Sequence, residues 1–171
     1  NVQTVDGLLE AVKQGRLASL RSFPRTFVEH LPRSLERVMS YRGKYLLSTG
    51  LNRAGEVLSQ LASQGLRAQV TGGCRRYSEV IERVEILVEG HGGEGGRILS
   101  VLDEPGGVLR GDTLVMPGSS GTPPVDLRLV SRERWPVELL LTTGSGAHLD
   151  ALRGYASEMG MEIGGAEITR K

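Results

Sequence analysis

The sequence predicts an α+β fold in which a small helical subdomain precedes a mixed β-sheet flanked by helices. Up to about residue 65, apolar side chains recur at spacings of three and four, which is typical of amphipathic helices. From residue 66 the period changes to two, and glycine-rich turns separate short runs of β-prone residues. With 171 residues, of which 24 are glycine, the chain suits one domain or two small subdomains with many tight loops.

The first half of the chain is expected to be helical. Thr4 can cap a first helix and Gly15 can end it; its apolar residues are Val5, Leu8, Leu9 and Val12. Next, Pro24 and Pro32 are expected to separate short helical segments, because proline removes a backbone donor. A longer helix ending near Gly65 follows, and its buried stripe consists of Leu51, Ala54, Leu58 and Leu61.

Five short runs are expected to form the sheet: RAQV (67–70), RVEILV (83–88), ILSVL (98–102), VLRGDTLVM (108–116) and VDLRLV (125–130). In the second and last of these, apolar and charged residues alternate. Arg83 and Glu85 then share one face of their strand, and Asp126 lies on the polar face of the other. The segments 90–97 and 116–124 are expected to be loops.

The end of the chain is expected to be a strand end at residues 142–143, a glycine turn and a helix. Ser145 is the expected N-cap, and Gly160 is expected to end the helix in the left-handed conformation. The inward-facing residues of this helix are expected to be Leu149, Leu152, Ala156 and Met159.

Composition favours a soluble, cytoplasmic protein. No apolar run reaches the roughly 18 to 20 residues that span a bilayer, no signal segment opens the chain, and a single cysteine, Cys74, fits a reducing compartment. Residues 1–60 hold nine Lys and Arg against five Asp and Glu, whereas residues 61–171 hold twelve against fifteen. This asymmetry is explained either by a basic N-terminal part, residues 1–60, that faces a polyanion or by an ordinary solvated helical surface.

The sequence GGCRRY (72–77) is a candidate phosphate site. Backbone N–H groups of a Gly-Gly turn followed by arginines allow phosphate oxygens to approach closely. A turn beside a solvent-exposed basic pair is the alternative interpretation.

Three segments together carry a resemblance to a known family. GGCRRYSEVIERVEILV (72–88) resembles, without a gap, the motif of family X DNA polymerases in which G-S-x-R-R is followed by G-D-x-D-x-L-V. VDLRLV resembles the strand with that family's third carboxylate, and residues 142–163 resemble its F-T-G-S-x-x-H-N-x-x-L-R-x-x-A-x-x-x-G segment. Residues 5–38 resemble the second helix-hairpin-helix element of the fingers in these polymerase β-like enzymes.

The resemblance implies a fingers-like segment at 1–45, a nucleotidyltransferase palm at 46–142 and the start of a thumb at 143–171, within a longer polypeptide. The partners that the resemblance implies for the chain are dNTP and gapped or primer-template DNA. The residues implied at the incoming triphosphate are Gly72, Gly73 and Arg76, where Gly73 replaces the family's serine. Gly144 and Ser145 are implied at the nucleotide sugar and Arg153 at the template strand; Leu149 replaces the usual asparagine.

The metal centre implied by the resemblance is altered. Two Mg²⁺ or Mn²⁺ ions require three converging carboxylates, of which Asp126 and the longer Glu85 are kept, whereas Arg83 takes the first position. At about 4 Å and an effective dielectric of about 20, one unit-charge pair is worth roughly 4 kcal/mol, and a divalent ion doubles this. We therefore expect Arg83 to form an ion pair with Glu85 or Asp126 where metals bind in the family.

The fingers hairpin is altered as well, since RSFPRT (21–26) lacks the glycines that approach a phosphate. Non-specific DNA contacts remain possible for six basic residues: Arg21, Arg25, Arg33, Arg37, Arg42 and Lys44. The sequence thus leaves two hypotheses. One is a DNA-repair nucleotidyltransferase module, impaired or inactive in template-directed, metal-dependent dNTP addition, and the other is a non-catalytic relative that binds DNA or acts as a scaffold.

Overall fold

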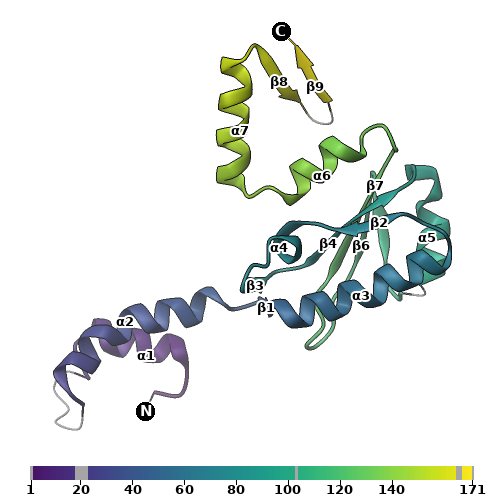
Figure 1. The fold of residues 1–171 in the computed structure, drawn as a ribbon. Helices are drawn as coiled ribbons and strands as arrows, with labels where there is room; N and C mark the ends of the chain where they lie inside the picture. The colour runs from purple at the N-terminus through teal and green to yellow at the C-terminus, as the bar shows by residue number, and fades with distance from the viewer. Residues whose placement is uncertain (1, 18–22, 103, 165–166, 171) are drawn as a thin grey trace. The chain divides into compact units, whose positions relative to one another are not determined.

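The computed structural model describes residues 2–17, 23–102, 104–164 and 167–170. The chain divides between Gly43 and Lys44 into two compact units, which are described separately (Figure 1). The three functional segments expected from the family resemblance remain a prediction.

The first unit is a pair of helices, α1 (Val5–Lys13) and α2 (Arg25–Ser40). Thr4 caps α1 as expected, because its Oγ1 accepts the N–H of Gly7 at 3.0 Å. Asp6 at the start of α1 accepts two hydrogen bonds from the Arg42 guanidinium, at 3.1 and 2.6 Å. The helices pack through a buried cluster of Leu9, Ala11, Val12, Leu17 and Leu35.

The expected break at Pro32 is wrong, since Pro32 lies inside the continuous helix α2. An interior proline costs a helix about 3 kcal/mol or more, but it removes only one backbone hydrogen bond. The apolar face of α2 packs on α1 through Leu35, with Leu31 and Val28 beside it. Tertiary packing of this face therefore keeps the helix continuous.

The second unit contains a central sheet, a short strand pair and a C-terminal hairpin (Figure 1). Its helical elements are α3 (Leu47–Ser63), α4 (Gly72–Arg75), η1 (Gly92–Glu94), α5 (Gly95–Leu102), α6 (Trp135–Thr143) and α7 (Gly146–Glu158). The central strands are β2 (Ala68–Val70), β4 (Val84–Glu89), β5 (Val108–Arg110), β6 (Thr113–Met116) and β7 (Val125–Val130). The short pair is β1 (Tyr45–Leu46) with β3 (Val80–Ile81), and the hairpin is β8 (Met161–Gly164) with β9 (Glu167–Arg170).

The central sheet has the strand order β2-β4-β7-β6-β5. Strands β4 and β7 are parallel and the other neighbours are antiparallel, so the sheet is mixed and the predicted α+β fold is confirmed. In the parallel pair, Glu85 lies directly opposite Asp126. None of the helices in the described ranges combines the length and apolar composition needed to cross a membrane.

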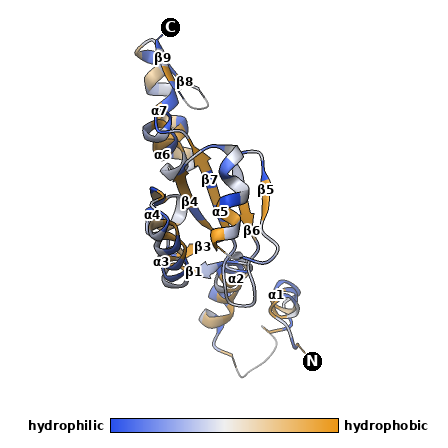
Figure 2. Cartoon of the chain, turned by 90° about the vertical axis from the view of Figure 1, so that its right-hand side faces the viewer, coloured by the Kyte–Doolittle hydropathy of each residue, from blue (hydrophilic) through white to orange (hydrophobic). Residues whose placement is uncertain are grey.

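The two faces of this sheet have different partners. Helices α3 and α5 pack on the face that carries the buried residues Val84, Ile86, Val88, Val125, Leu127 and Leu129, as the alternation predicts. In Figure 2 the central strands are drawn largely in the hydrophobic colour. On the opposite face, Leu87 and Val130 are buried against Trp135 of α6. Glu85 and Asp126 also point to this second face, nearer the start of the strands.

Three secondary-structure expectations are wrong in this unit, the last of them in part. The segment ILSVL forms the end of α5, and residues 142–143 end α6 instead of a strand. Ile98 and Leu102 are four residues apart and both buried, so a helix places them on the same core. Part of the expected loop at 90–97 is likewise helical, because η1 and the start of α5 lie in it.

Candidate functional site

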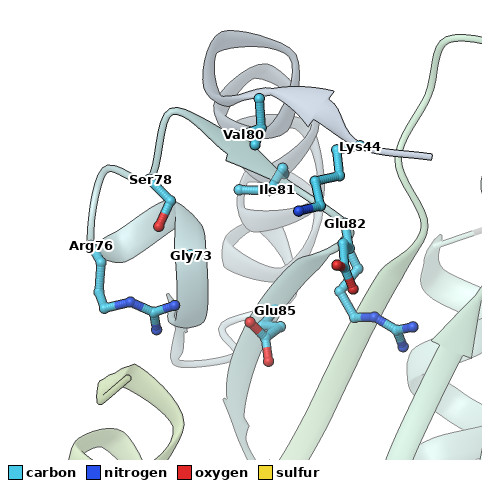
Figure 3. Close-up of a pocket in the computed structure, with 9 residues that line it drawn as sticks. Lys44, Gly73, Arg76, Ser78, Val80, Ile81, Glu82 and Glu85 are labelled. Carbon is cyan, nitrogen blue, oxygen red and sulfur yellow. The ribbon is translucent and has the colours of Figure 1, made fainter. Parts of the chain in front are cut away.

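Three cavities meet at the start of β4, and Glu85 lines each of them. Their volumes are about 310, 110 and 550 Å³. Figure 3 shows the 310 Å³ cavity, with Arg76 and Ser78 on the α4 side, Lys44 and Glu82 on the other, and Glu85 between them. We call the three together the β4 site.

The β4 site collects most residues that the sequence predicts to be functional. The 310 Å³ cavity contains Gly73, Arg76, Arg83, Glu85 and the predicted DNA contact Lys44. The 110 Å³ cavity joins Glu85 to Asp126. The 550 Å³ cavity contains Arg76, Glu85, Gly144, Ser145 and Arg153. Arg25, predicted to contact DNA, belongs to the first unit, and Arg21 lies outside the described residues.

The two glycines of the predicted phosphate turn hold Glu85. Gly72 is buried and has a left-handed backbone, with φ of +57°, and a Cβ at this position would overlap the Glu85 carboxylate. The backbone of Gly73 hydrogen bonds to the same carboxylate. Close approach of a carboxylate of the chain itself therefore explains why glycine is needed here.

Burial raises the pKa of Glu85 above its ordinary range. The negative charge of Asp126 raises it further, whereas the hydrogen bond from Gly73 and the charges of Arg76 and Arg83 lower it. The Cys74 thiol is buried beside this carboxylate, and burial together with the charge of Glu85 raises the pKa of that thiol. Cys74 is thus a buried cysteine whose raised pKa keeps it protonated and weakly nucleophilic.

The expected ion pair of Arg83 is confirmed, and its partner is Asp126. Arg83 Nη1 donates to Asp126 Oδ2 at 2.8 Å, with 49% of the arginine side chain and 21% of the aspartate side chain exposed. This hydrogen bond raises the pKa of the Arg83 guanidinium, so the charge is permanent. The other oxygen of the aspartate, Oδ1, is buried and has no hydrogen-bond partner among the described residues.

These residues do not fit a two-metal centre. One oxygen of Asp126 is bound to a guanidinium, and Glu85 accepts from the backbone of Gly73. No group of three His, Cys, Asp or Glu side chains within the described ranges is placed to hold a metal ion. Two carboxylates and a permanent cation do not supply the ligands that paired Mg²⁺ ions require.

Arg76 connects α4 to the last helices of the unit. Its Nη1 donates to the carbonyl oxygen of Thr143 at 2.7 Å, at the C-terminal end of α6, where a positive charge is favourable. Helix α7 begins just after, and Ser145 is its N-cap as predicted, with Oγ accepting the N–H of His148 at 3.3 Å. Arg76 therefore lies between the 310 and 550 Å³ cavities.

Sequence reasoning missed a buried carboxylate in the 550 Å³ cavity. Glu138 is only 2% exposed and contacts two arginines, Arg134 at 3.0 Å and Arg128 at 3.5 Å. The i,i+4 spacing of Arg134 and Glu138 is visible in the sequence and indicates a helical pair. Burial of the carboxylate and the approach of Arg128 from β7 depend on the tertiary fold.

The predicted DNA-contacting arginines form weak local pairs. Arg153 lies 3.4 Å from Asp150, and Arg25 lies 3.2 Å from Glu29, both on exposed helical surfaces. Such pairs contribute about 0 to 1 kcal/mol, so they are easily exchanged for another anion.

No protein-family model matches the chain, and no curated protein matches it either. The family resemblance therefore rests on the sequence motifs.

Proposed function

We propose that the chain is a non-catalytic, DNA-binding relative of the family X DNA polymerase palm, in which an arginine–aspartate ion pair occupies the position of the catalytic metals. The observation that carries this proposal is the 2.8 Å contact between Arg83 and Asp126, beside Glu85 on the parallel strand. We further propose that it acts in the cytoplasm, as its single cysteine suggests.

The ion pair supports a loss of catalysis through two effects. The Arg83 charge repels a divalent cation that approaches Asp126, and it holds the oxygen that a metal would need. Half of the Arg83 side chain is exposed, so solvent weakens the repulsion below the roughly 8 kcal/mol of the simple Coulomb estimate. Replacement of a third carboxylate by a cation still disfavours metal binding.

The arrangement of basic side chains supports DNA binding. Arg76, Arg128 and Arg153 line the 550 Å³ cavity. These three arginines face two carboxylates in the same cavity, Glu85 and the buried Glu138, and Glu138 is paired with Arg128 and with Arg134. Lysine and arginine contacts to phosphates release counterions, so binding of this kind weakens steeply as salt rises.

A second candidate function is impaired, metal-dependent addition of dNTP. It is favoured by the buried Oδ1 of Asp126, which has no hydrogen-bond partner in the part of the chain that the structure describes, and by the register that places Asp126 opposite Glu85. Mn²⁺ is the metal to test, because it accepts incomplete ligand sets more readily than Mg²⁺.

The experiment is to incubate the full chain with gapped primer-template DNA and dNTPs, with Mg²⁺ or Mn²⁺, while measuring primer extension and fluorescence anisotropy. We expect salt-sensitive binding and no extension. Arg153→Gln should weaken binding more than the matched control Arg110→Gln, which removes an exposed arginine that lines none of the three cavities. Extension that Asp126→Ala abolishes would favour the second candidate, and absence of both binding and extension would contradict both.

A further inference from the structure

The two phenylalanines of the chain stack on each other at the surface of the first unit. The ring centroids of Phe23 and Phe27 are 5.7 Å apart, and the ring planes differ by 14°. Phe23 is 41% exposed and Phe27 is 47% exposed. Phenylalanine is among the residues most often buried, so a chain with only two that exposes both at one place is unusual.

Among the residues that the structure describes, these rings are not part of the core of their unit. That core is formed by aliphatic residues: Leu9, Ala11, Val12, Leu17 and Leu35, with Val5, Leu8, Val28, Leu31 and Met39 beside them. Phe27 lies only four residues before Leu31 on α2, yet it remains half-exposed. Packing against the described residues of this unit therefore does not explain the pair.

Basic side chains lie near the pair and farther along the same helix. Phe23 lines a cavity of about 480 Å³ together with Arg25, Val28 and Glu29. The Arg25 side chain is 93% exposed, and its pair with Glu29 is of the weak surface kind. Farther along α2, Arg33 and Arg37 form no ion pair with any described residue. Proteins that bind single strands combine aromatic faces, on which bases stack, with basic residues along the backbone.

We propose that Phe23 and Phe27 form a stacking platform for unpaired bases of single-stranded DNA, with arginines of α2 on the neighbouring phosphates. The exposed rings alone would fit a second protein equally well, but α2 carries three arginines against two glutamates, Glu29 and Glu36, and this excess of positive charge favours a polyanion. The choice of DNA as the source of the bases rests on the proposed function. The proposal that bases stack on these rings depends only on residues of the first unit.

The test uses the full chain and fluorescein-labelled oligothymidylate of about 12 nucleotides, within the range of site sizes of single-strand binders. Phe27→Leu keeps an apolar side chain and removes the ring, whereas Phe27→Trp keeps an aromatic face. Val38→Ala is the matched control, because it trims another exposed apolar residue of α2, 54% exposed. Circular dichroism and thermal unfolding check that each variant is folded.

We expect Phe27→Leu to weaken oligothymidylate binding at least about fivefold, the lower end of what one stacked base contributes. Phe27→Trp should restore binding and Val38→Ala should leave it unchanged. Equal binding by wild type and Phe27→Leu would overturn the proposal. So would a concentration-dependent dimer in sedimentation that Phe27→Leu abolishes, because the rings would then contact a second copy.

Two further measurements separate this proposal from the proposed function. If gapped DNA binds with normal salt dependence while Phe27→Leu has no effect on oligothymidylate, only the stacking platform fails. If oligouridylate binds through Phe27 and no DNA binds, the platform stands, whereas DNA as its ligand and the proposed function both fail.

Discussion

The contact between Gly72 and Glu85 predicts how much the substitution Gly72→Ala lowers the free energy of unfolding. In Gly72→Ala the new Cβ would overlap the Glu85 carboxylate and would also sit on a backbone with φ of +57°. Gly65→Ala is the matched control within the same unit, since Gly65 has φ of +71° and a Cβ at this position would have no described atom within 4 Å. The two substitutions share the backbone penalty and differ in the contact with Glu85.

The backbone penalty for an L residue in the left-handed region is about 1 to 2 kcal/mol, and reduced entropy of the unfolded chain offsets about 0.4 to 1 kcal/mol of it. Gly65→Ala should therefore lower the free energy of unfolding by about 1 kcal/mol. Gly72→Ala must in addition displace Glu85 from its hydrogen bond with Gly73, which costs a further 1 to 3 kcal/mol or so. The expected total loss of free energy of unfolding for Gly72→Ala is about 3 kcal/mol, which lowers the Tm by roughly 6 to 12 °C.

Urea and thermal unfolding followed by the fluorescence of Trp135 provide the assay, because this single tryptophan is buried in the second unit. Gly72→Ala should lose more stability than Gly65→Ala. Adding Glu85→Ala to Gly72→Ala should remove most of this extra loss, since the overlapping carboxylate is then absent. If Gly72→Ala destabilises the protein no more than Gly65→Ala does, the Glu85 carboxylate does not pack against Gly72.

Three further predictions concern the same site. Arg83→Asp combined with Glu85→Asp should create measurable Mn²⁺ binding by calorimetry, because three carboxylates then replace two carboxylates and a cation; unchanged affinity would show that these positions do not converge. Burial raises the pKa of Glu85 above its ordinary 4.5, so the wild type should lose stability as pH rises through that raised pKa. The free energy of unfolding of Glu85→Gln minus that of the wild type, measured in urea, should accordingly increase from about pH 4.5 upward and then level off. A difference between the two proteins that does not change with pH would contradict this. Tyr77 is 75% exposed with φ of +57°, so Tyr77→Gly should be neutral or stabilise by up to about 1 kcal/mol, and a lower Tm for this variant in thermal unfolding would contradict the prediction.

Much of the fold could be predicted from local pattern. The alternation in residues 83–88 and 125–130 identifies two strands and assigns their core faces correctly, since side chains alternate across any β-strand. Thr4 and Ser145 were correctly predicted as N-caps because the cap hydrogen bond involves only neighbouring residues. At two of the failures, Pro32 and ILSVL, packing against distant helices or strands outweighs local preference.

The sequence by itself determined that a cation stands among the charged residues of two strands, because that follows from residue type and the period of two. Only the tertiary structure decided that Arg83 pairs with Asp126 while Glu85 turns to the backbone of Gly73. That choice depends on the parallel register of β4 and β7 and on a left-handed glycine that leaves room for a carboxylate. Burial of Glu138 between two arginines was decided in the same way, since its depth depends on how α6 packs on the sheet. Spacing along a chain fixes which side chains share a face, whereas the partner of each charge is set by segments that approach it from elsewhere in the sequence.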